Sequence, residues 1–371
     1  MLRQIHLLGA ATIFVCGGVW SAVSQEVRPG VSAAKTPDVL PLPTDGYEAF
    51  LVGELHGLEE NELFQVQYLT RLHRAAGLRD VAIEEDAVYE SDAQAFVDGR
   101  SNVLPPSLCL RAGLLEAIRR LNVGLDSGKA IRVHLTDIDS PAIAILQHLL
   151  IIKNRLEANQ VSLPNEAVIK QHGLRTVGQL KRLTKDSATL SELRTIELSV
   201  LAYRQGLEID TGPSKGSPYL DSREQAVASN IVDLIRARGI SSLLVIYGSD
   251  HVSRTLRKDG GPNRDRPFIP MARRLEQSGI KAYSLVTLPL AGRSYWRGSG
   301  SELPWTATDG QLASGESFDR ILSALPDAQF LYIDTKSQRA RLPTQDFSKM
   351  TADAFLLFRS GSPMQNHCET H

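Results

Sequence analysis

Short apolar runs alternate with longer helical patterns along most of this chain, and this alternation constrains the fold more than any other sequence feature. The runs are almost continuously apolar and are bounded by turn-forming residues, as in strands that a sheet buries on both faces. They cover residues 49–53, 80–83, 131–136, 242–247, 280–288, 329–333 and 354–358. The pattern predicts a parallel sheet covered by helices.

The segment between the first two runs has helical periodicity. Within residues 59–76, apolar side chains at 63, 66, 69, 72 and 76 form one buried stripe, and Gly77 is a natural helix stop. A strand–helix–strand unit of this size forms a right-handed crossover. Helical patterns at 222–238 and 267–277 frame the fourth run in the same way. The prediction is an α/β fold, with a mostly parallel open sheet flanked by helices.

Residues 140–210 interrupt the alternation with helical periods, many polar positions and no convincing strand. They predict a helical insertion, which either acts as a cap subdomain over the sheet or simply adds packing helices. A chain of 371 residues has room for one large domain or two modest ones. We expect residues 46–371 to form a single α/β domain that contains this insertion.

The N-terminus has the pattern of a signal peptide. Arg3 precedes an apolar run over 7–19, and Ala-Val-Ser at 22–24 is a plausible cleavage site. The run is shorter than the roughly 20 apolar residues of a membrane-spanning helix. We predict a signal peptide over 1–24, an extended lead-in over 25–45 and a periplasmic or secreted protein without a stable membrane span. The alternative is an uncleaved anchor.

The charge balance argues against nucleic acid as a partner, because 42 acidic and 41 basic side chains give a formal net charge of -1. A small molecule or a peptide is the expected substrate. Removal of the signal leaves Cys109 and Cys368, and the sequence leaves open whether they pair. His367, Cys368 and His371 could ligate a metal, although such a tail is usually frayed.

Ionisable side chains follow four of the predicted strands. The sequences are Gly-Glu-Leu-His-Gly at 53–57, Glu-Glu-Asp at 84–86, Asp-Ile-Asp at 137–139 and Gly-Ser-Asp-His at 248–251. Ligands of an open parallel sheet bind outside the carboxyl ends of its strands. We therefore expect these groups to converge on one crevice.

Glu54, His56 and Glu84 are the first candidates for that crevice. Glu54 and His56 are alternate residues of an extended segment and can reach a common ligand, and the glycines on either side suggest a close backbone approach. The alternative is that Glu54 caps the next helix and His56 is an exposed loop residue. Glu84 follows its strand directly, and the alternative there is a solvated acidic turn.

His251 is the fourth candidate, and its alternative role is that of a cap partner. Asp137 either positions a catalytic histidine or caps a helix that starts near Ser140. Arg223 binds a substrate carboxylate, holds its helix against the site or forms a surface salt bridge. Asp250 is a further candidate for substrate binding or support.

Two histidines with several carboxylates suit the activation of water. A histidine beside a carboxylate is a general base near neutral pH, and a second histidine can protonate a leaving group or stabilise an oxyanion. The same set can hold a divalent metal on His56, Glu84 and His251, and the sequence does not separate the two routes. No G-x-S-x-G nucleophile elbow follows a predicted strand, and the sequence contains no P-loop, dinucleotide or H-E-x-x-H motif, which disfavours the usual serine hydrolases and nucleotide-driven enzymes.

At these residues the chain resembles the superfamily that joins erythromycin esterases, ChaN-like haem-binding proteins and the TIKI/TraB group. The resemblance rests first on G-E-L-H-G and the helix after it, with Gln65 and Gln67, and on V-A-I-E-E-D at 81–86. It continues through S-R-E-Q-A-V-A-S-N-I at 222–231, V-I-Y-G-S-D-H-V-S-R at 245–254 and D-A-F-L-L-F-R-S-G-S-P at 353–363. Together these segments span most of the mature chain.

The resemblance implies that functional residues fall on Glu54, His56, Glu84 and His251. The esterase branch implies metal-independent attack of water on an ester, the TIKI branch a divalent-metal hydrolase of peptides, and the ChaN branch haem or iron handling. One residue separates Gly-Glu from His in this chain, whereas esterases have two, so macrolide hydrolysis is in doubt.

We expect an exported hydrolase that cleaves an ester or amide bond with activated water. His56 is the general base or a metal ligand, Glu54 orients it, and His251 and Glu84 stabilise charge or aid the leaving group. The alternative is a haem- or iron-binding protein that uses the same crevice, with the histidines and Tyr247 or Tyr89 as ligands. A third reading is an inactive scaffold that presents the helical cap to a partner.

Overall fold

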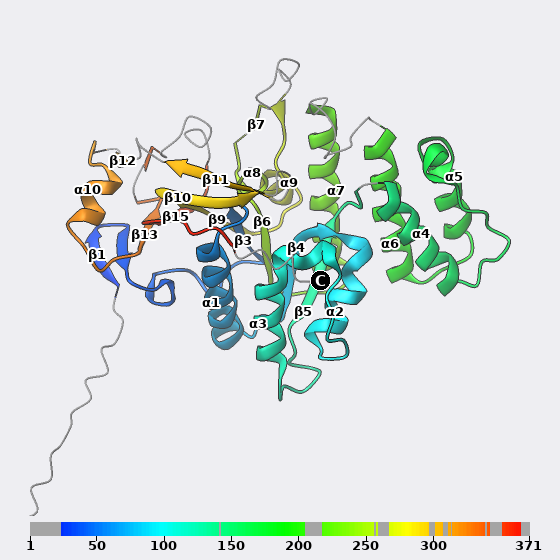
Figure 1. The fold of residues 1–371 in the computed structure, drawn as a ribbon, viewed down its shortest axis with the longest axis horizontal. Helices are drawn as coiled ribbons and strands as arrows, with labels where there is room; N and C mark the ends of the chain where they lie inside the picture. Colours follow the sequence, from blue (N-terminus) through cyan, green and yellow to red (C-terminus); the bar gives the residue numbers. More distant parts are fainter. Residues whose placement is uncertain are drawn as a thin grey trace, which may run out of the picture.

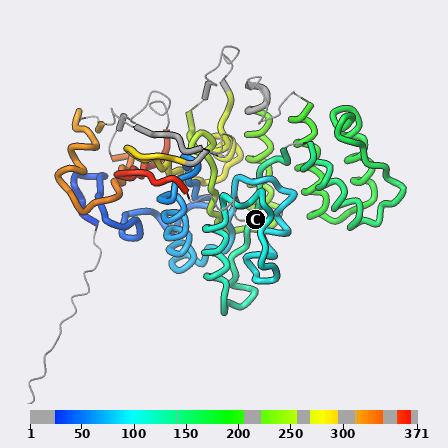
Figure 2. Tube along the Cα trace, viewed as in Figure 1, coloured from blue at the N-terminus to red at the C-terminus, as the bar shows by residue number. Residues whose placement is uncertain are grey.

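The computed structural model of this protein describes most of the chain (Figures 1 and 2). Residues 1–23 of the predicted signal peptide and the C-terminal residues His367, Cys368 and His371 lie outside the described residues. The described ranges are 24–140, 142–204, 217–255, 257–258, 267–296, 301–306, 311–312, 314–337, 340–341 and 351–364.

One nine-stranded sheet organises the protein, in the order β1-β2-β13-β15-β9-β3-β6-β4-β5. Its pairs from β15 to β5 are all parallel, which confirms the predicted α/β fold with a mostly parallel sheet. The strands of this parallel part correspond closely to six of the seven predicted runs. They are β3 (Ala49–Glu54), β4 (Asp80–Asp86), β5 (Arg132–Asp137), β6 (Leu243–Gly248), β9 (Ala282–Pro289) and β15 (Ala354–Phe358).

The opposite edge of the sheet is antiparallel and includes part of the expected lead-in. Strands β1 (Gln25–Arg28), β2 (Val31–Ala34) and β13 (Phe330–Asp334) extend the sheet beyond β15. The lead-in is thus more ordered than its Pro, Ser and Ala content suggested, because β2 is buried against β13. A 3₁₀ turn, η1 (Pro37–Val39), follows β2.

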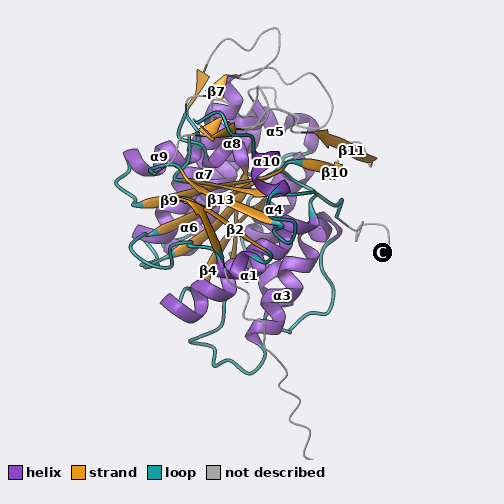
Figure 3. Cartoon of the chain, turned by 90° about the vertical axis from the view of Figure 1, so that its left-hand side faces the viewer, coloured by secondary structure: helices purple, strands orange, loops and turns teal. Residues whose placement is uncertain are grey.

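Helices cover both faces of the sheet (Figure 3). Alternate residues of β3 show the division, because Ala49 and Leu51 belong to one core cluster and Phe50 and Val52 to the other. The face of Phe50 packs against α1 (Glu59–Ala76), α2 (Glu90–Val97) and α3 (Ala112–Asn122). The face of Leu51 packs against α7 (Ser217–Arg236), α9 (Met271–Gln277) and α10 (Phe318–Ser323).

The predicted insertion is a group of three helices at one end of the molecule (Figure 1). They are α4 (Ala142–Arg155), α5 (Ile169–Lys181) and α6 (Ser187–Arg204), and η4 (Glu166–Val168) precedes α5. The three helices bury a separate apolar cluster that includes Ile145, Val177 and Ile196. We call residues 142–204 the cap.

The remaining elements are short. They are η2 (Ala87–Tyr89), η3 (Pro106–Arg111), α8 (Ser249–Val252), β7 (Arg257–Lys258), β8 (Pro267–Phe268), β10 (Ala291–Trp296), β11 (Ser301–Thr306), β12 (Gln311–Leu312) and β14 (Ala340–Arg341). The β10–β11 hairpin was not predicted. Among the described residues, the helices are all too short or too polar to cross a membrane.

Candidate active site

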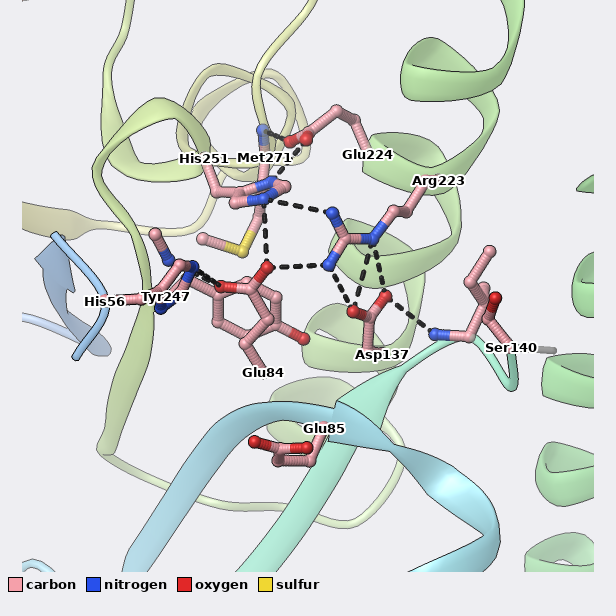
Figure 4. A network of polar contacts seen from close by, with 12 residues as sticks. His56, Glu84, Glu85, Asp137, Ser140, Arg223, Glu224, Tyr247, His251 and Met271 are labelled. Carbon is pink, nitrogen blue, oxygen red and sulfur yellow. Dashed lines mark hydrogen bonds and ion pairs between the residues drawn. The ribbon is translucent and has the colours of Figure 1, made fainter. Parts of the chain in front are cut away.

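The carboxyl ends of neighbouring strands bring together side chains that are far apart in the sequence (Figure 4). Glu54 ends β3, Glu84 lies near the end of β4 and Asp137 ends β5. His251 lies in α8, directly after β6. Because β3, β6, β4 and β5 are adjacent and parallel, these groups meet at one edge of the sheet.

Glu54 and His56 form a hydrogen-bonded pair at the mouth of this cluster. The Nδ1 atom of His56 lies 2.9 Å from Oε1 of Glu54. The Glu54 side chain is 4% exposed, whereas 37% of the His56 side chain is exposed. The predicted close approach occurs at Gly53, where a Cβ atom would lie 2.2 Å from Cγ2 of Val252. The carboxylate is therefore fixed in the protein while the imidazole faces solvent.

Glu54 does not cap α1, because Gln65 and Arg111 hold its carboxylate. Gln65 donates a hydrogen bond to Oε2, and the Arg111 guanidinium donates to Oε1 over 2.6 Å. Burial alone would raise the pKa of Glu54, but the Arg111 charge and the His56 hydrogen bond lower this pKa to about 2. Burial lowers the pKa of His56, but its Glu54 hydrogen bond and the Glu84 charge outweigh burial and raise it.

A bulge in β4 separates the directions of the consecutive residues Glu84 and Glu85. Ile83 pairs with Leu135 and Asp86 with Asp137, so β4 has one more residue than β5 over this stretch. Glu84 binds Arg223, whereas Glu85 accepts a hydrogen bond from Arg111 over 3.2 Å. The sequence alone predicted that one residue of the acidic run faces the cluster, and Glu84 is that residue.

Glu84 is the centre of the polar network (Figure 4). Its Oε2 atom accepts a hydrogen bond from the Gly248 backbone N–H over 2.6 Å and lies 3.7 Å from Nε2 of His56. Its Oε1 atom lies 2.6 Å from the Arg223 guanidinium and 3.2 Å from Nε2 of His251. Burial raises the pKa of Glu84, but the charges of His251 and Arg223 hold this pKa well below its usual range. Glu84 is therefore an anion that faces His56.

His251 is enclosed between two carboxylates. Its Nε2 atom faces Glu84, and its Nδ1 atom forms an ion pair with Glu224, whose side chain is fully buried. Burial lowers the pKa of His251, but Glu224 and then Glu84 raise it to about 10. The Nε2 atom also lies 3.3 Å from the Arg223 guanidinium. At neutral pH His251 is an imidazolium that keeps Glu84 ionised.

Arg223 resolves two open alternatives of the sequence analysis. Its guanidinium, 13% exposed, donates hydrogen bonds to Asp137 and Glu84, so it is not a surface salt bridge. Asp137 positions this arginine and accepts the backbone N–H of Ile138, and among the described residues it bonds neither His251 nor the first turn of α4. Asp250 is exposed on α8.

Arg111 is the residue of this cluster that the sequence analysis missed. It lies in η3, remote from every predicted strand end, and no local motif distinguishes it from the other arginines of the chain. The sequence analysis also gave Glu224 no role of its own. The only signal for Glu224 was its position directly after Arg223, in the helical segment on which the resemblance rests.

His56, Glu84 and His251 do not fit a metal ion in this arrangement, and Tyr247 does not fit the role of a haem ligand. The described residues contain no group of three or more His, Cys, Asp and Glu side chains arranged for a metal ion. Glu84 is the one carboxylate among the three expected metal ligands, and His251 and Arg223 already provide it with positive charge. Tyr247, named as a haem ligand, is fully buried, and its hydroxyl lies 2.8 Å from that of Thr136.

A second histidine–carboxylate pair joins the cap to the sheet. Nδ1 of His148, on α4, lies 2.7 Å from Oδ2 of Asp139, and Nε2 lies 3.6 Å from Glu192 on α6. The side chains of His148 and Asp139 are 4% and 0% exposed. Burial lowers the pKa of His148, but the Asp139 charge and hydrogen bond raise it to about 9.

Cys109 lies in η3 near the site and is buried. It is disulfide-bonded, and Cys368 lies outside the described residues.

No protein-family model matches the sequence, and no curated protein resembles it significantly. Three solved structures share its fold. A Bacillus cereus protein has 16% identity and a TM-score of 0.63 and covers 90% of this chain and 95% of its own. A variant of the erythromycin esterase EreC in its open conformation has 14% identity and a TM-score of 0.60, covering 87% and 93%.

The third structure is a succinoglycan biosynthesis protein with 13% identity and a TM-score of 0.61, which covers 89% of this chain and 93% of its own. All three matches extend over most of both chains. The likeness is one of fold. It confirms the fold that the resemblance implies, because this chain shares its fold with an erythromycin esterase and with two further solved structures.

Proposed function

We propose that this protein is an exported hydrolase that cleaves an ester or amide bond with water activated by His56. One observation supports the proposal above the others: a fixed, ionised Glu54 orients a histidine whose own ring is exposed. With Nδ1 bound to Glu54, Nε2 is the nitrogen left to take a proton from water. An erythromycin esterase is among the proteins with this fold.

Glu84 gives the base a partner. Its Oε2 atom lies 3.7 Å from Nε2 of His56, too far for a direct hydrogen bond. A water molecule beside both atoms can direct one proton at each of them, which leaves its lone pair for a carbonyl carbon. His251 and Arg223 support this role because they keep Glu84 ionised.

The proposed reaction balances without a further reactant. Water adds to the carbonyl carbon as His56 takes its proton, and collapse of the tetrahedral adduct breaks the bond to the alcohol or amine. The proton on His56 then passes to the leaving group. The products are a carboxylic acid and an alcohol or amine.

Export rests on the N-terminal sequence pattern, which predicts a periplasmic or secreted protein. Expression of the full chain with fractionation tests it. Mass spectrometry of the exported protein should show an N-terminus near Gln25, and an uncleaved cytoplasmic product would contradict it.

A hydrolysis screen of the purified protein tests the proposed activity. Aryl esters, aliphatic esters, lactones and peptides are offered with and without chelator, to wild type and His56→Ala. We expect ester or amide turnover that survives chelation and is lost in His56→Ala. Turnover that requires added manganese or cobalt, or that His56→Ala retains in full, would contradict the proposal.

A further inference from the structure

A cavity lies between the cap and the outer edge of the sheet, away from the candidate active site. Its volume is 810 Å³, within the range of about 300–1,000 Å³ that ligand pockets occupy. Residues of α2, β5, α4, α6 and α7 line it. The cavity follows the length of β5, whereas the candidate active site lies at the carboxyl ends of the strands.

The free edge of β5 is closed to an added peptide strand. The backbone N–H of Val133 donates to Gln94 over 2.8 Å, and that of Leu135 donates to Glu90 over 3.1 Å. Side chains of α2 therefore occupy the hydrogen bonds that an extended peptide would use. The cavity suits a compact ligand better than a strand.

The charges around the cavity are paired, which favours a neutral ligand. Each charged side chain of its described lining has an opposite charge within 4.0 Å, so neither a cation nor an anion finds an excess of opposite charge. The pairs are Arg132–Asp80, His134–Asp80, Arg155–Glu192, His148–Asp139, Arg100–Asp98, Arg238–Glu90 and Arg194–Asp233.

One niche of the cavity wall is formed by His134, Glu90 and Arg238. His134 is 7% exposed, and its Nε2 atom is bound to Asp80 over 2.9 Å. Its buried Nδ1 atom has no hydrogen-bond partner among the described residues and lies 3.8 Å from Oε1 of Glu90. The Arg238 guanidinium lies 3.9 Å from the same oxygen. Both separations exceed hydrogen-bond length.

The chemistry of the niche matches one functional group. His134 and Arg238 offer two N–H donors within 4.0 Å of the same Glu90 oxygen, which is an acceptor. The pKa of His134 supports a donor at Nδ1, because the Asp80 and Glu90 carboxylates outweigh burial and raise it. A hydroxyl group accepts two hydrogen bonds and donates one. It therefore satisfies all three groups at once.

We propose that this cavity binds a neutral polyhydroxylated ligand of saccharide type, with one hydroxyl seated among His134, Arg238 and Glu90. The site is distinct from His56 and makes no use of the proposed hydrolysis.

Nuclear magnetic resonance tests the proposal through the His134 imidazole. Glucose, cellobiose and inorganic phosphate are titrated separately into the intact protein at millimolar concentration. We expect a saturable shift of the His134 signals with at least one sugar and none with phosphate. The Arg238→Gln variant should weaken sugar binding about tenfold, because it removes a charged hydrogen-bond donor from a partly exposed position.

The control is Arg236→Gln, which makes the same charge change two residues earlier, at the last residue of α7. Arg236 pairs with Glu48 and is not among the lining residues. Sugar binding should be unchanged in this variant. The proposal is overturned if neither sugar gives a saturable shift, if phosphate binds instead, or if Arg238→Gln binds sugar as well as Arg236→Gln does.

Discussion

The pairs Glu54–His56 and Asp139–His148 have the same chemistry and opposite surroundings. In each, a buried carboxylate lies within 2.9 Å of a histidine Nδ1 atom, and the histidine pKa is raised. His56 is 37% exposed, whereas His148 is 4% exposed and has Glu192 beside its other nitrogen. A histidine–carboxylate pair is therefore not catalytic by itself. The histidine can act as a base only if solvent or substrate can reach its Nε2 atom; otherwise the pair has a structural role.

The largest expected difference between the two pairs is in catalytic activity, when the histidine of each pair is replaced. His56→Ala should lower kcat/KM by about 10³-fold, because it removes the general base. His148→Ala should leave kcat/KM per folded molecule within about threefold. Steady-state kinetics on the best ester of the screen measure both values. Equal losses in the two variants would contradict the comparison.

Stability should show the reverse order. His148→Ala leaves the buried carboxylate of Asp139 without its cation and should lower the free energy of unfolding by about 3 kcal/mol. His56→Ala changes a partly exposed side chain and should cost less than about 1 kcal/mol. Urea denaturation of the two variants measures the difference, and a larger cost for His56→Ala would reverse our assignment of the structural pair.

The pH dependence of stability isolates His148. Its pKa is about 9 in the folded protein and about 6.5 in an unfolded chain, so its stabilising contribution is full below pH 6.5 and is lost as pH rises through 9. His134 and His251 act in the same direction, so the informative quantity is the difference between wild type and His148→Gln. This difference should shrink from pH 6 to above pH 9, and a constant difference would contradict it.

The Glu54 carboxylate should move the pH profile of activity. A general base acts when neutral, so kcat/KM should rise with pH through a His56 pKa above 6.5. Glu54→Gln removes the charge that helps to raise this pKa and makes the hydrogen bond to His56 a neutral one, so the inflection should fall and the rate should drop about tenfold. An unchanged inflection in Glu54→Gln would mean that another group controls the profile.

Asp86, near the junction of the sheet and the cap, gives the smallest expected effect. Burial and then the charges of Asp139 and Asp137 raise its pKa to about 9, so at pH 7 folding requires a proton that the unfolded chain has released. Asp86→Asn should therefore stabilise the protein by about 1 kcal/mol at pH 7 and by less near pH 3, where both states are protonated. Denaturation at the two pH values measures this.

The sequence predicted the architecture well where apolar periodicity carries the information. Helix α1 has its predicted bounds, and the strands of the parallel part lie within one or two residues of their predicted runs in most cases. The sequence analysis missed strands β1 and β2 because both are short. They join the sheet only where β2 pairs with β13, more than 290 residues away in the sequence. The β10–β11 hairpin lacks the alternation that would have marked it.

The placement of the ionisable groups was predictable only in part. Parallel strands place their carboxyl ends together, so the meeting of Glu54, Glu84 and Asp137 follows from topology. The roles of Arg111 and Arg223 depend on where a 3₁₀ turn and a helix pack, which no local pattern specifies. The separation of Glu84 from Glu85 depends on a single extra residue in β4.

A direct comparison of two pKa values tests the claim that His56 is the base. Nuclear magnetic resonance of the imidazole signals gives the pKa of His56, and kcat/KM against pH gives the pKa that controls turnover in chelator-treated protein. We predict that the two values coincide above 6.5 and fall together in Glu54→Gln. A kinetic pKa that departs from that of His56, or that stays fixed when the His56 value moves, would contradict the account.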